Sequence, residues 1–365
     1  MNNNGKSMEF NCIKNNKENK GIYKAFNFNN RIKKEIFNLF KKKYFQICKI
    51  MMILILISFF INFEMNYIIE NKIIKNYIIK NTKVCICTPV KKENRYIKEY
   101  VEHYIKYGVD KIFLYDNNKL NGERLEDVIG EFIKKGIVEV FDYRGKVKPL
   151  FNIMNNCYQR NYQIYDWIIF FEVDEYIHLY NYTNVKLYLQ RDVFKNCEKI
   201  HLNWVHHTDN NLIYYDDRPL HIRFPEVEPN ARNNVSGSVN SVKSILRGHI
   251  PNVVIDCIHK LTLKLKGCDG FGNPQVILSI DTNNSDFTYY YIDHYYSKSV
   301  EEFVEKLNKG DVLQGQKIWL KYLRLNNYFE RNNITLDKLN FIEERTHLNL
   351  SEFRIRLKKL HKNVN

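Results

Sequence analysis

Three carboxylates directly follow an apolar run in the segment Trp167–Ile177, which reads WIIFFEVDEYI. The uninterrupted run predicts a strand buried on both faces of a sheet. An unpaired charge at the end of such a strand is costly to desolvate, and a bound cation offsets that cost. Glu172 and Asp174 stand two residues apart, so in an extended chain both side chains point the same way and can share one divalent ion. This arrangement favours a site for the phosphates of a nucleotide, with an exposed acidic turn as the alternative.

Two further segments carry side chains with suitable chemistry. His294, in the Tyr-rich segment Tyr289–Tyr295, can supply a nitrogen ligand to the same cation, although a histidine in such a segment is more often a buried core residue. Asp209 follows Trp204 in the segment WVHHTDN and has the chemistry of a general base, but an Asx-rich turn explains it equally well. Basic side chains that can bind phosphate, or simply form a solvated face, occur at Lys243 and Arg247.

Strands and helices alternate after residue 83. Apolar runs predict strands at 84–87, 112–115 and 137–141, and helical spacing predicts helices between them. Such repeats imply a mostly parallel sheet with right-handed crossovers, whose ligands bind beyond the carboxyl ends of the strands. The residues that follow these strand ends, and that we expect on one rim with the acidic segment, are Pro89, Lys91, Glu93, Asp116 and Asn117. Further on, Ser299 and Glu302 form a capping box, which predicts a helix start.

The distribution of charge argues against a nucleic-acid-binding protein. Residues 1–80 hold 15 Lys and Arg and 5 Asp and Glu, so most of the net charge of +15 lies in the first 80 of 365 residues. A surface that reads nucleic acid would lie on the folded domain instead. Residues 44–63 are apolar and long enough to span a bilayer, with Lys41–Lys43 just before them. The sequence therefore predicts a type II signal anchor with a cytoplasmic N-terminus; a cleaved signal peptide is the rival interpretation.

The remaining boundaries follow from this anchor. We expect a disordered basic tail at 1–43, a stem at 64–82, the folded domain at 83–310 and a helical C-terminal extension at 311–365. The spacing of the eight cysteines shows no zinc pattern. Cys85 and Cys87 are expected to be small core residues. One disulfide among the later cysteines fits a lumenal domain, but the sequence does not choose between Cys157, Cys197, Cys257 and Cys268.

Four blocks in this order resemble glycosyltransferase family 92-like enzymes, which have a GT-A fold. They are VCICTPVKKENRYIKEYVEHYIKYGVDKIFLYDNN, DWIIFFEVDEYI, VKSILRG and IDHYYSKSVEEFVEKLNKG, running from Val84 to Gly310. The resemblance implies a GT-A-type, Rossmann-like α/β fold, a mixed sheet flanked by helices, here preceded by a transmembrane helix. It also implies a metal-dependent hexosyltransferase that uses Mn²⁺ or Mg²⁺. The donor would be a UDP-sugar such as UDP-galactose, the acceptor a glycan hydroxyl, and the anomeric carbon would be inverted.

Carried over residue by residue, Asp174 is the metal ligand and Glu172 fills the first acidic position, where the family usually has Asp. His294 takes the position of a later His-Tyr pair, while Asp116 and Glu93 fall near the nucleotide. For the general base we expect Asp209, with Asp269 as the alternative. Trp204, Lys243 and Arg247 complete the expected substrate-binding set. The replacement at Glu172 also fits the alternative function, a carbohydrate-binding protein that keeps a catalytically decayed GT-A fold.

Overall fold

The computed structural model describes residues 16–147, 149–228, 242–259, 261–262, 264–274, 288–309, 329–330 and 332–362. The chain divides into two compact units, one ending at Ile74 and the other beginning at Lys75. The expected boundary between residues 310 and 311 lies outside the described residues.

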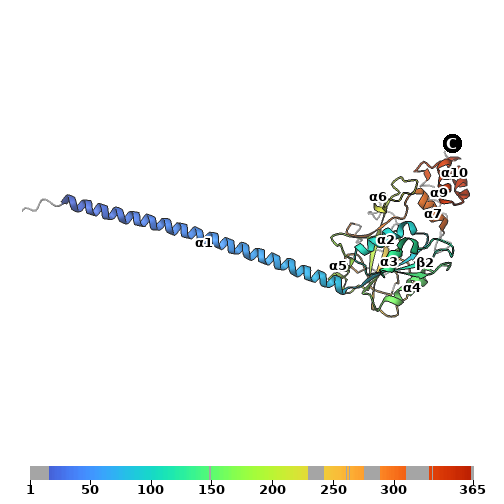
Figure 1. Cartoon of the computed structure of the whole chain (residues 1–365), viewed down its shortest axis with the longest axis horizontal. Coiled ribbons are helices and arrows are strands. Elements are labelled where there is room, and N and C mark those ends of the chain that lie inside the picture. Colours follow the sequence, from blue (N-terminus) through green and yellow to red (C-terminus); the bar gives the residue numbers. More distant parts are fainter. Residues whose placement is uncertain are drawn as a thin grey trace, which may run out of the picture. The chain divides into compact units, whose positions relative to one another are not determined.

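The described part of the first unit belongs to one long helix, α1 (Asn16–Asn81), which Figure 1 shows in blue and whose last residues belong to the second unit. It runs through the expected anchor at 44–63 and stem at 64–82. Residues 16–43 are therefore helical, where the sequence predicts a disordered tail. The physical reason is that α1 contains no proline and a single glycine, Gly21, so nothing interrupts the helix. In the described part of the chain, it is the one helix long and apolar enough to cross a membrane.

The second unit is built on a mixed sheet whose strands have the order β3-β2-β1-β4-β7-β6-β9-β5, with β8 beside β6. β1 pairs in parallel with β2 and β4, and β7 is antiparallel to β4. The strands are β1 (Val84–Val90), β2 (Lys111–Asp116), β3 (Val138–Asp142), β4 (Trp167–Ile169), β5 (Glu175–Leu179), β6 (Lys199–His206), β7 (Val242–Arg247), β8 (Gly267–Cys268) and β9 (Tyr290–His294). The expected α/β fold with a mixed sheet flanked by helices is confirmed.

Helices cover both faces of this sheet (Figure 1). The helices beyond α1 are α2 (Asn94–Lys106), α3 (Glu126–Lys134), α4 (Leu150–Asn161), α5 (Val185–Leu189), α6 (Leu220–Arg223), α7 (Val300–Lys309), α9 (Leu336–Thr346) and α10 (Ser351–Lys362), with a 3₁₀ turn at Asp192–Phe194. Alternate residues of β1 serve opposite faces. Val84 and Ile86 pack with α2 and α3, whereas Cys85 and Cys87 pack with α4. The strand is thus buried on both faces, as its apolar sequence predicts.

The acidic segment does not form one continuous strand with Trp167. β4 stops at Ile169 and β5 begins at Glu175, so Glu172 and Asp174 lie in the connection between them. The Glu175 amide donates to the Glu172 carbonyl (3.1 Å), and the Glu172 amide donates to the Glu175 carboxylate (2.8 Å). These reciprocal bonds close a turn, which explains why the extended conformation predicted from the apolar run is wrong here.

The C-terminal helices share a hydrophobic cluster with α7. Val300 and Phe303 of α7 pack with Leu339 of α9 and Phe353 of α10. The predicted capping box starts α7, because the Ser299 amide donates to the Glu302 carboxylate (3.1 Å) and the Glu302 amide donates to the Ser299 hydroxyl (3.3 Å). The described part of 311–365 is therefore helical and continues the core that α7 begins.

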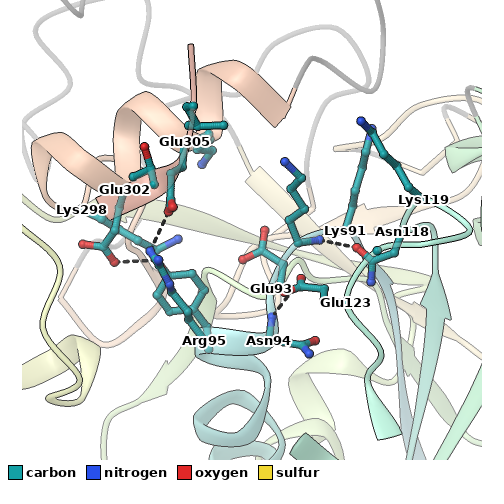
Figure 2. Close-up of a pocket in the computed structure, with 16 residues that line it drawn as sticks. Lys91, Glu93, Asn94, Arg95, Asn118, Lys119, Glu123, Lys298, Glu302 and Glu305 are labelled. Carbon is teal, nitrogen blue, oxygen red and sulfur yellow. Dashed lines mark hydrogen bonds and ion pairs between the residues drawn. The ribbon is translucent and has the colours of Figure 1, made fainter. Parts of the chain in front are cut away.

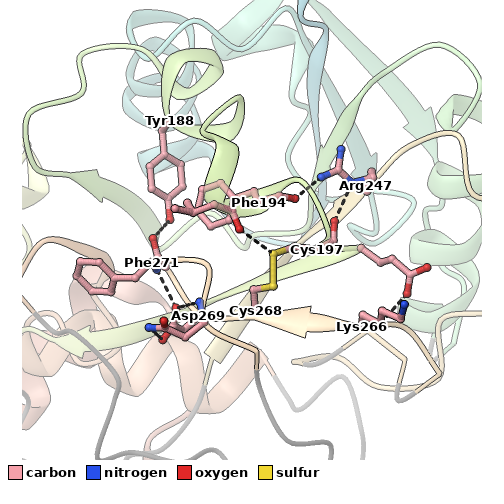
Figure 3. The surroundings of a disulfide bond; sticks show 12 residues. Tyr188, Phe194, Cys197, Arg247, Lys266, Cys268, Asp269 and Phe271 are labelled. Carbon is pink, nitrogen blue, oxygen red and sulfur yellow. Dashed lines mark hydrogen bonds between the residues drawn. A yellow bond between two sulfur atoms is a disulfide. The ribbon is translucent and has the colours of Figure 1, made fainter.

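Two disulfides connect elements that lie far apart in the sequence. Cys87 of β1 is bonded to Cys157 of α4, and Cys197 is bonded to Cys268 of β8 (Figure 3). Cys87 is a buried core residue, as expected, but it is also disulfide-bonded, because its side chain lies on the face of β1 that α4 covers. Cys85 is free and buried, as expected. Paired disulfides are typical of oxidising compartments.

We expect peptide mapping under non-reducing conditions to recover Cys87 with Cys157 and Cys197 with Cys268. A Cys257→Ser variant is the matched control, because Cys257 is a free cysteine and its loss should leave both pairs intact. Recovery of all four bonded cysteines as free thiols from protein secreted through an oxidising compartment would contradict the pairing.

Candidate active site

A cavity of about 340 Å³ opens beyond the carboxyl ends of β1 and β2 and beside the acidic connection. Its wall contains eight of the residues expected at the site: Pro89, Lys91, Glu93, Asn117, Glu172, Asp174, Trp204 and His294. The parallel strands deliver the first four, because Pro89 lies near the carboxyl end of β1 and the other three follow β1 or β2 on the same side of the sheet. The residues expected at this edge of the sheet therefore line a cavity.

Asp174 is the most heavily engaged carboxylate in this wall. Its side chain is buried, and Lys306 of α7 donates to it from 2.8 Å. His294 of β9 faces the other carboxylate oxygen, with its Nε2 3.8 Å away. Burial alone would raise the pKa of Asp174, but the charges of Lys306 and Lys298 outweigh it and hold the pKa well below its ordinary value. Asp174 is therefore ionised at neutral pH.

A second charge cluster lies next to it around Lys243. The Lys243 ammonium is buried on β7 and lies 2.5 Å from the Glu172 carboxylate and 3.5 Å from that of Glu175. Burial opposes its charge, but the two glutamates raise the pKa of Lys243 above its ordinary value. Burial raises the pKa of Glu175, and the charges of Glu172 and Asp174 add to the effect. Lys243 thus serves as the counterion of this cluster rather than as a surface cation.

His294 and Trp204 present unsatisfied polar atoms in the same region. The two rings lie against each other, with their centroids 4.2 Å apart. His294 Nδ1 and Trp204 Nε1 are buried and make no hydrogen bond to the described residues. Burial lowers the pKa of His294 well below its ordinary value, so the imidazole is neutral. A neutral imidazole is the form that binds a metal ion.

The Asp174 carboxylate and the His294 imidazole fit a divalent metal ion with two protein ligands. Among the described residues, His, Cys, Asp and Glu side chains form no group of three that could hold a metal. Asp174 and His294 supply one oxygen and one nitrogen, while Glu172 is engaged by Lys243. Phosphate and water oxygens can fill the remaining positions around Mn²⁺ or Mg²⁺. The expected third ligand, Glu172, is therefore not brought to the other two.

A family model describes the same region of the chain. The model of glycosyltransferase family 92 matches residues 80–312, which include every residue named in the cavity wall. The chain belongs to glycosyltransferase family 92.

Two curated members of family 92 match part of the chain. A family 92 protein of Ricinus communis is 32% identical over 104 residues, which are 27% of this chain and 18% of that protein. One of Oryza sativa subsp. japonica is 26% identical over 105 residues, 28% of this chain and again 18% of the relative. The aligned part thus spans about a fifth of each relative. Among solved structures, S. aureus TarS 1–349 in complex with UDP has a TM-score of 0.33 and 11% identity, covering 71% of this chain and 77% of that one.

Not every residue expected from the family 92 resemblance lies in the cavity wall. Asp116 is buried behind the rim, where Arg144 lies 2.7 Å from its carboxylate and the Asn118 amide donates to it. Asp209 accepts hydrogen bonds from the Asn211 amide and from the Asn332 side chain. Both aspartates are thus occupied in local structure, and Asp209 fits the turn alternative rather than the general base.

Asp269 and Arg247 lie around the disulfide of Cys197 instead (Figure 3). The Asp269 carboxylate accepts from the amides of Phe271 and Asn273, which makes it the centre of a turn. Arg247 donates to the carbonyls of Phe194 and Cys197. Since β7 runs antiparallel to β4, Arg247 pairs with Trp167, at the end of β4 remote from the acidic connection. Neither side chain reaches the cavity.

Sequence reasoning missed Lys306, which the structure places against Asp174. Its signal was available in the helix that starts at Ser299. Phe303, Lys306 and Leu307 follow helical spacing and all line the cavity, so they form one face of α7. His259 and Tyr296 also line the cavity, but neither has a distinguishing local pattern.

Proposed function

We propose that this chain is a membrane-anchored glycosyltransferase that moves a hexose from a UDP-sugar, with UDP-galactose as the first candidate, to a hydroxyl of a glycan. The observation that carries the proposal is the cavity wall in which Asp174, His294 and Trp204 lie together. Membership of family 92 supports the reaction class. The position beyond the carboxyl ends of β1 and β2 supports a nucleotide ligand.

The residues of the wall have complementary roles in this proposal. The Trp204 indole N–H has no partner among the described residues, and in this proposal it donates to an oxygen of the sugar nucleotide. The indole ring offers an apolar face to the sugar. Lys91 and Lys306 supply positive charge where the diphosphate leaves. Lys243 keeps Glu172 and Glu175 in place behind them.

Mn²⁺ or Mg²⁺ is the proposed cofactor, with Asp174 and His294 as the residues that would hold it. When bound, it would neutralise the negative charge of the departing nucleotide diphosphate. Lys306 donates to Asp174 from 2.8 Å, so the lysine and a bound metal would share the same carboxylate.

The reaction proposed is a direct displacement with inversion. The acceptor hydroxyl attacks the anomeric carbon, the bond to the diphosphate breaks, and the hydroxyl proton passes to a general base. Since Asp209 and Asp269 are held in turns, the base must come from the cavity wall. Besides Asp174, the described carboxylates of that wall are Glu93 and Glu172.

The proposed location follows from α1 and from the disulfides. With Lys41–Lys43 preceding the apolar stretch, the N-terminus stays in the cytoplasm and the family 92 region lies on the opposite side of the membrane. The two disulfides support an oxidising compartment for that region. This is a single-pass type II protein, facing the Golgi lumen in a eukaryote or attached to the inner membrane in a bacterium.

The full chain in detergent micelles tests the proposal. We expect it to release UDP from at least one UDP-hexose when Mn²⁺ or Mg²⁺ is present, and to lose this turnover when the metal is chelated. Binding of UDP-sugars should be measured in parallel by calorimetry. Neither turnover nor binding with any UDP-hexose would refute the enzyme, whereas glycan binding without turnover would favour the carbohydrate-binding alternative.

A further inference from the structure

Figure 2 shows the residues that line a second cavity, of about 360 Å³. It lies between the start of α2, the loop after β2, the start of α7 and the end of α9. Lys91, Glu93 and Lys306 line both cavities, so the two share a wall. A ligand in the second cavity would therefore lie next to whatever occupies the first.

Lys298 is the unusual residue of this second cavity. The residue as a whole is buried, with a relative exposure of 6%. It makes no hydrogen bond or ion pair to the described residues, and its ammonium lies 4.2 Å from the centre of the Tyr96 ring. Burial lowers the pKa of Lys298, and the more distant charges of Asp174 and Glu93 offset this only in part. An ammonium that lines a cavity, and that has no carboxylate within ion-pair distance among the described residues, is a candidate site for an anion.

Two glutamates of the wall, Glu302 and Glu305, are paired with other side chains. Glu302 is held by Arg223 at 2.8 Å and by the Tyr96 hydroxyl at 2.6 Å. Glu305 is held by Arg95 at 2.6 Å, as Figure 2 shows. Lysines and arginines also outnumber glutamates in the wall, by six to four. The described wall is therefore cationic, and Lys298 is the cation in it that is mostly buried yet has no carboxylate within ion-pair distance among the described residues.

We propose that the second cavity is an acceptor subsite for an anionic saccharide, a sugar that carries a phosphate or a carboxylate group paired with Lys298. The inference rests on the proposed function, because it treats the first cavity as the donor site. The charged group lies against Lys298, and a hydroxyl of the same sugar faces the wall that contains Lys91, Glu93 and Lys306.

The test measures binding to the full chain by titration calorimetry at low salt. The probes are glucose 6-phosphate, glucuronate, glucose and inorganic phosphate. We expect at least one of the two anionic sugars to bind about tenfold or more tightly than glucose and than inorganic phosphate. If glucose binds as tightly as both anionic sugars, the proposed recognition of the charged group by Lys298 is wrong. Equal affinity for inorganic phosphate would reduce the cavity to a simple anion site and overturn the saccharide assignment.

Variants at Lys298 connect this preference to the residue. Lys298→Met keeps the aliphatic stem on Tyr96 but should lower the affinity for the anionic sugar to about the affinity for glucose. Lys298→Arg should keep the higher affinity for the anionic sugar. Lys195→Met removes an exposed lysine from a turn outside the cavity and is the matched control. A Lys298→Met chain that binds glucose 6-phosphate and glucuronate as tightly as the unmodified chain would overturn the proposal. The comparison of probes on the unmodified chain stands even if a variant fails to fold.

The two proposals fail in different ways. If the unmodified chain releases UDP from a UDP-hexose but shows no preference for anionic sugars, the acceptor inference alone is wrong. If it binds the anionic sugars through Lys298 but neither binds nor turns over any UDP-hexose, the donor function is wrong, and the cavity is an anionic-sugar site without an acceptor role.

Discussion

Replacing Asp174 by asparagine is expected to lower turnover of the UDP-hexose substrate by about a hundredfold or more. Asp174 is buried, and Lys306 and His294 both face its carboxylate. The neutral amide removes the charge that would hold a divalent ion and leaves Lys306 without its counterion. The measurement is release of UDP by the full chain at saturating metal, beside thermal unfolding of the same preparation.

Two matched aspartates serve as controls for this experiment. Asp217→Asn changes an exposed residue and should leave turnover unchanged. Asp269→Asn changes a turn that the structure places outside the cavity, so its turnover should stay within a few-fold of the unmodified chain, about what loss of a turn contact allows. A hundredfold loss in Asp269→Asn with unchanged unfolding would return that residue to the catalytic role that the sequence suggested. Full activity in Asp174→Asn would refute the metal site.

Replacing Glu302 by alanine is expected to reduce the free energy of unfolding by about 3–5 kcal/mol. Glu302 and Arg223 are both buried, and their side chains lie 2.8 Å apart. The same carboxylate accepts from the Tyr96 hydroxyl and completes the capping box of α7 with Ser299. Alanine would leave the Arg223 guanidinium buried without a counterion, which is the main source of the loss. Thermal and urea unfolding, followed by tryptophan fluorescence, measure it.

Glu305→Ala is the matched control, because Glu305 lies on the same helix and pairs with Arg95. That pair is about one-third exposed on both sides. Its loss should therefore change the free energy of unfolding by about 1 kcal/mol or less. A double variant, Glu302→Leu with Arg223→Met, should recover much of the stability by removing both charges. Equal destabilisation by the two single alanine variants would contradict a special role for the buried pair.

The sequence predicts those parts of the site that depend on local patterns. The apolar run of β1 and the polar residues after it placed Lys91 and Glu93 correctly on the rim, because strand ends in a parallel sheet meet on one side. Asp174 and His294 were found from residue type and position in a buried segment. Both predictions needed only neighbouring residues.

The remainder of the site depends on contacts between distant residues. Asp174 and Lys306 are 132 residues apart, and no local pattern connects them. The general base shows the same limit. Asp209 and Asp269 had suitable chemistry, but the amides that hold them in turns are visible only in three dimensions. Arg247 was expected near phosphate, although the antiparallel pairing of β7 with β4 carries it to the other end of the strand.

The two lysines at the acidic connection make the folded site largely independent of added cations. Glu172, Asp174 and Glu175 are accompanied by Lys243 and Lys306, so the carboxylates have permanent counterions from the chain itself. A metal that reaches Asp174 must compete with the Lys306 ammonium, and its arrival is an exchange of one cation for another. If the proposed metal binds there, the site would keep its shape when the ion leaves, and its affinity for the ion would depend on how readily one lysine on α7 moves aside.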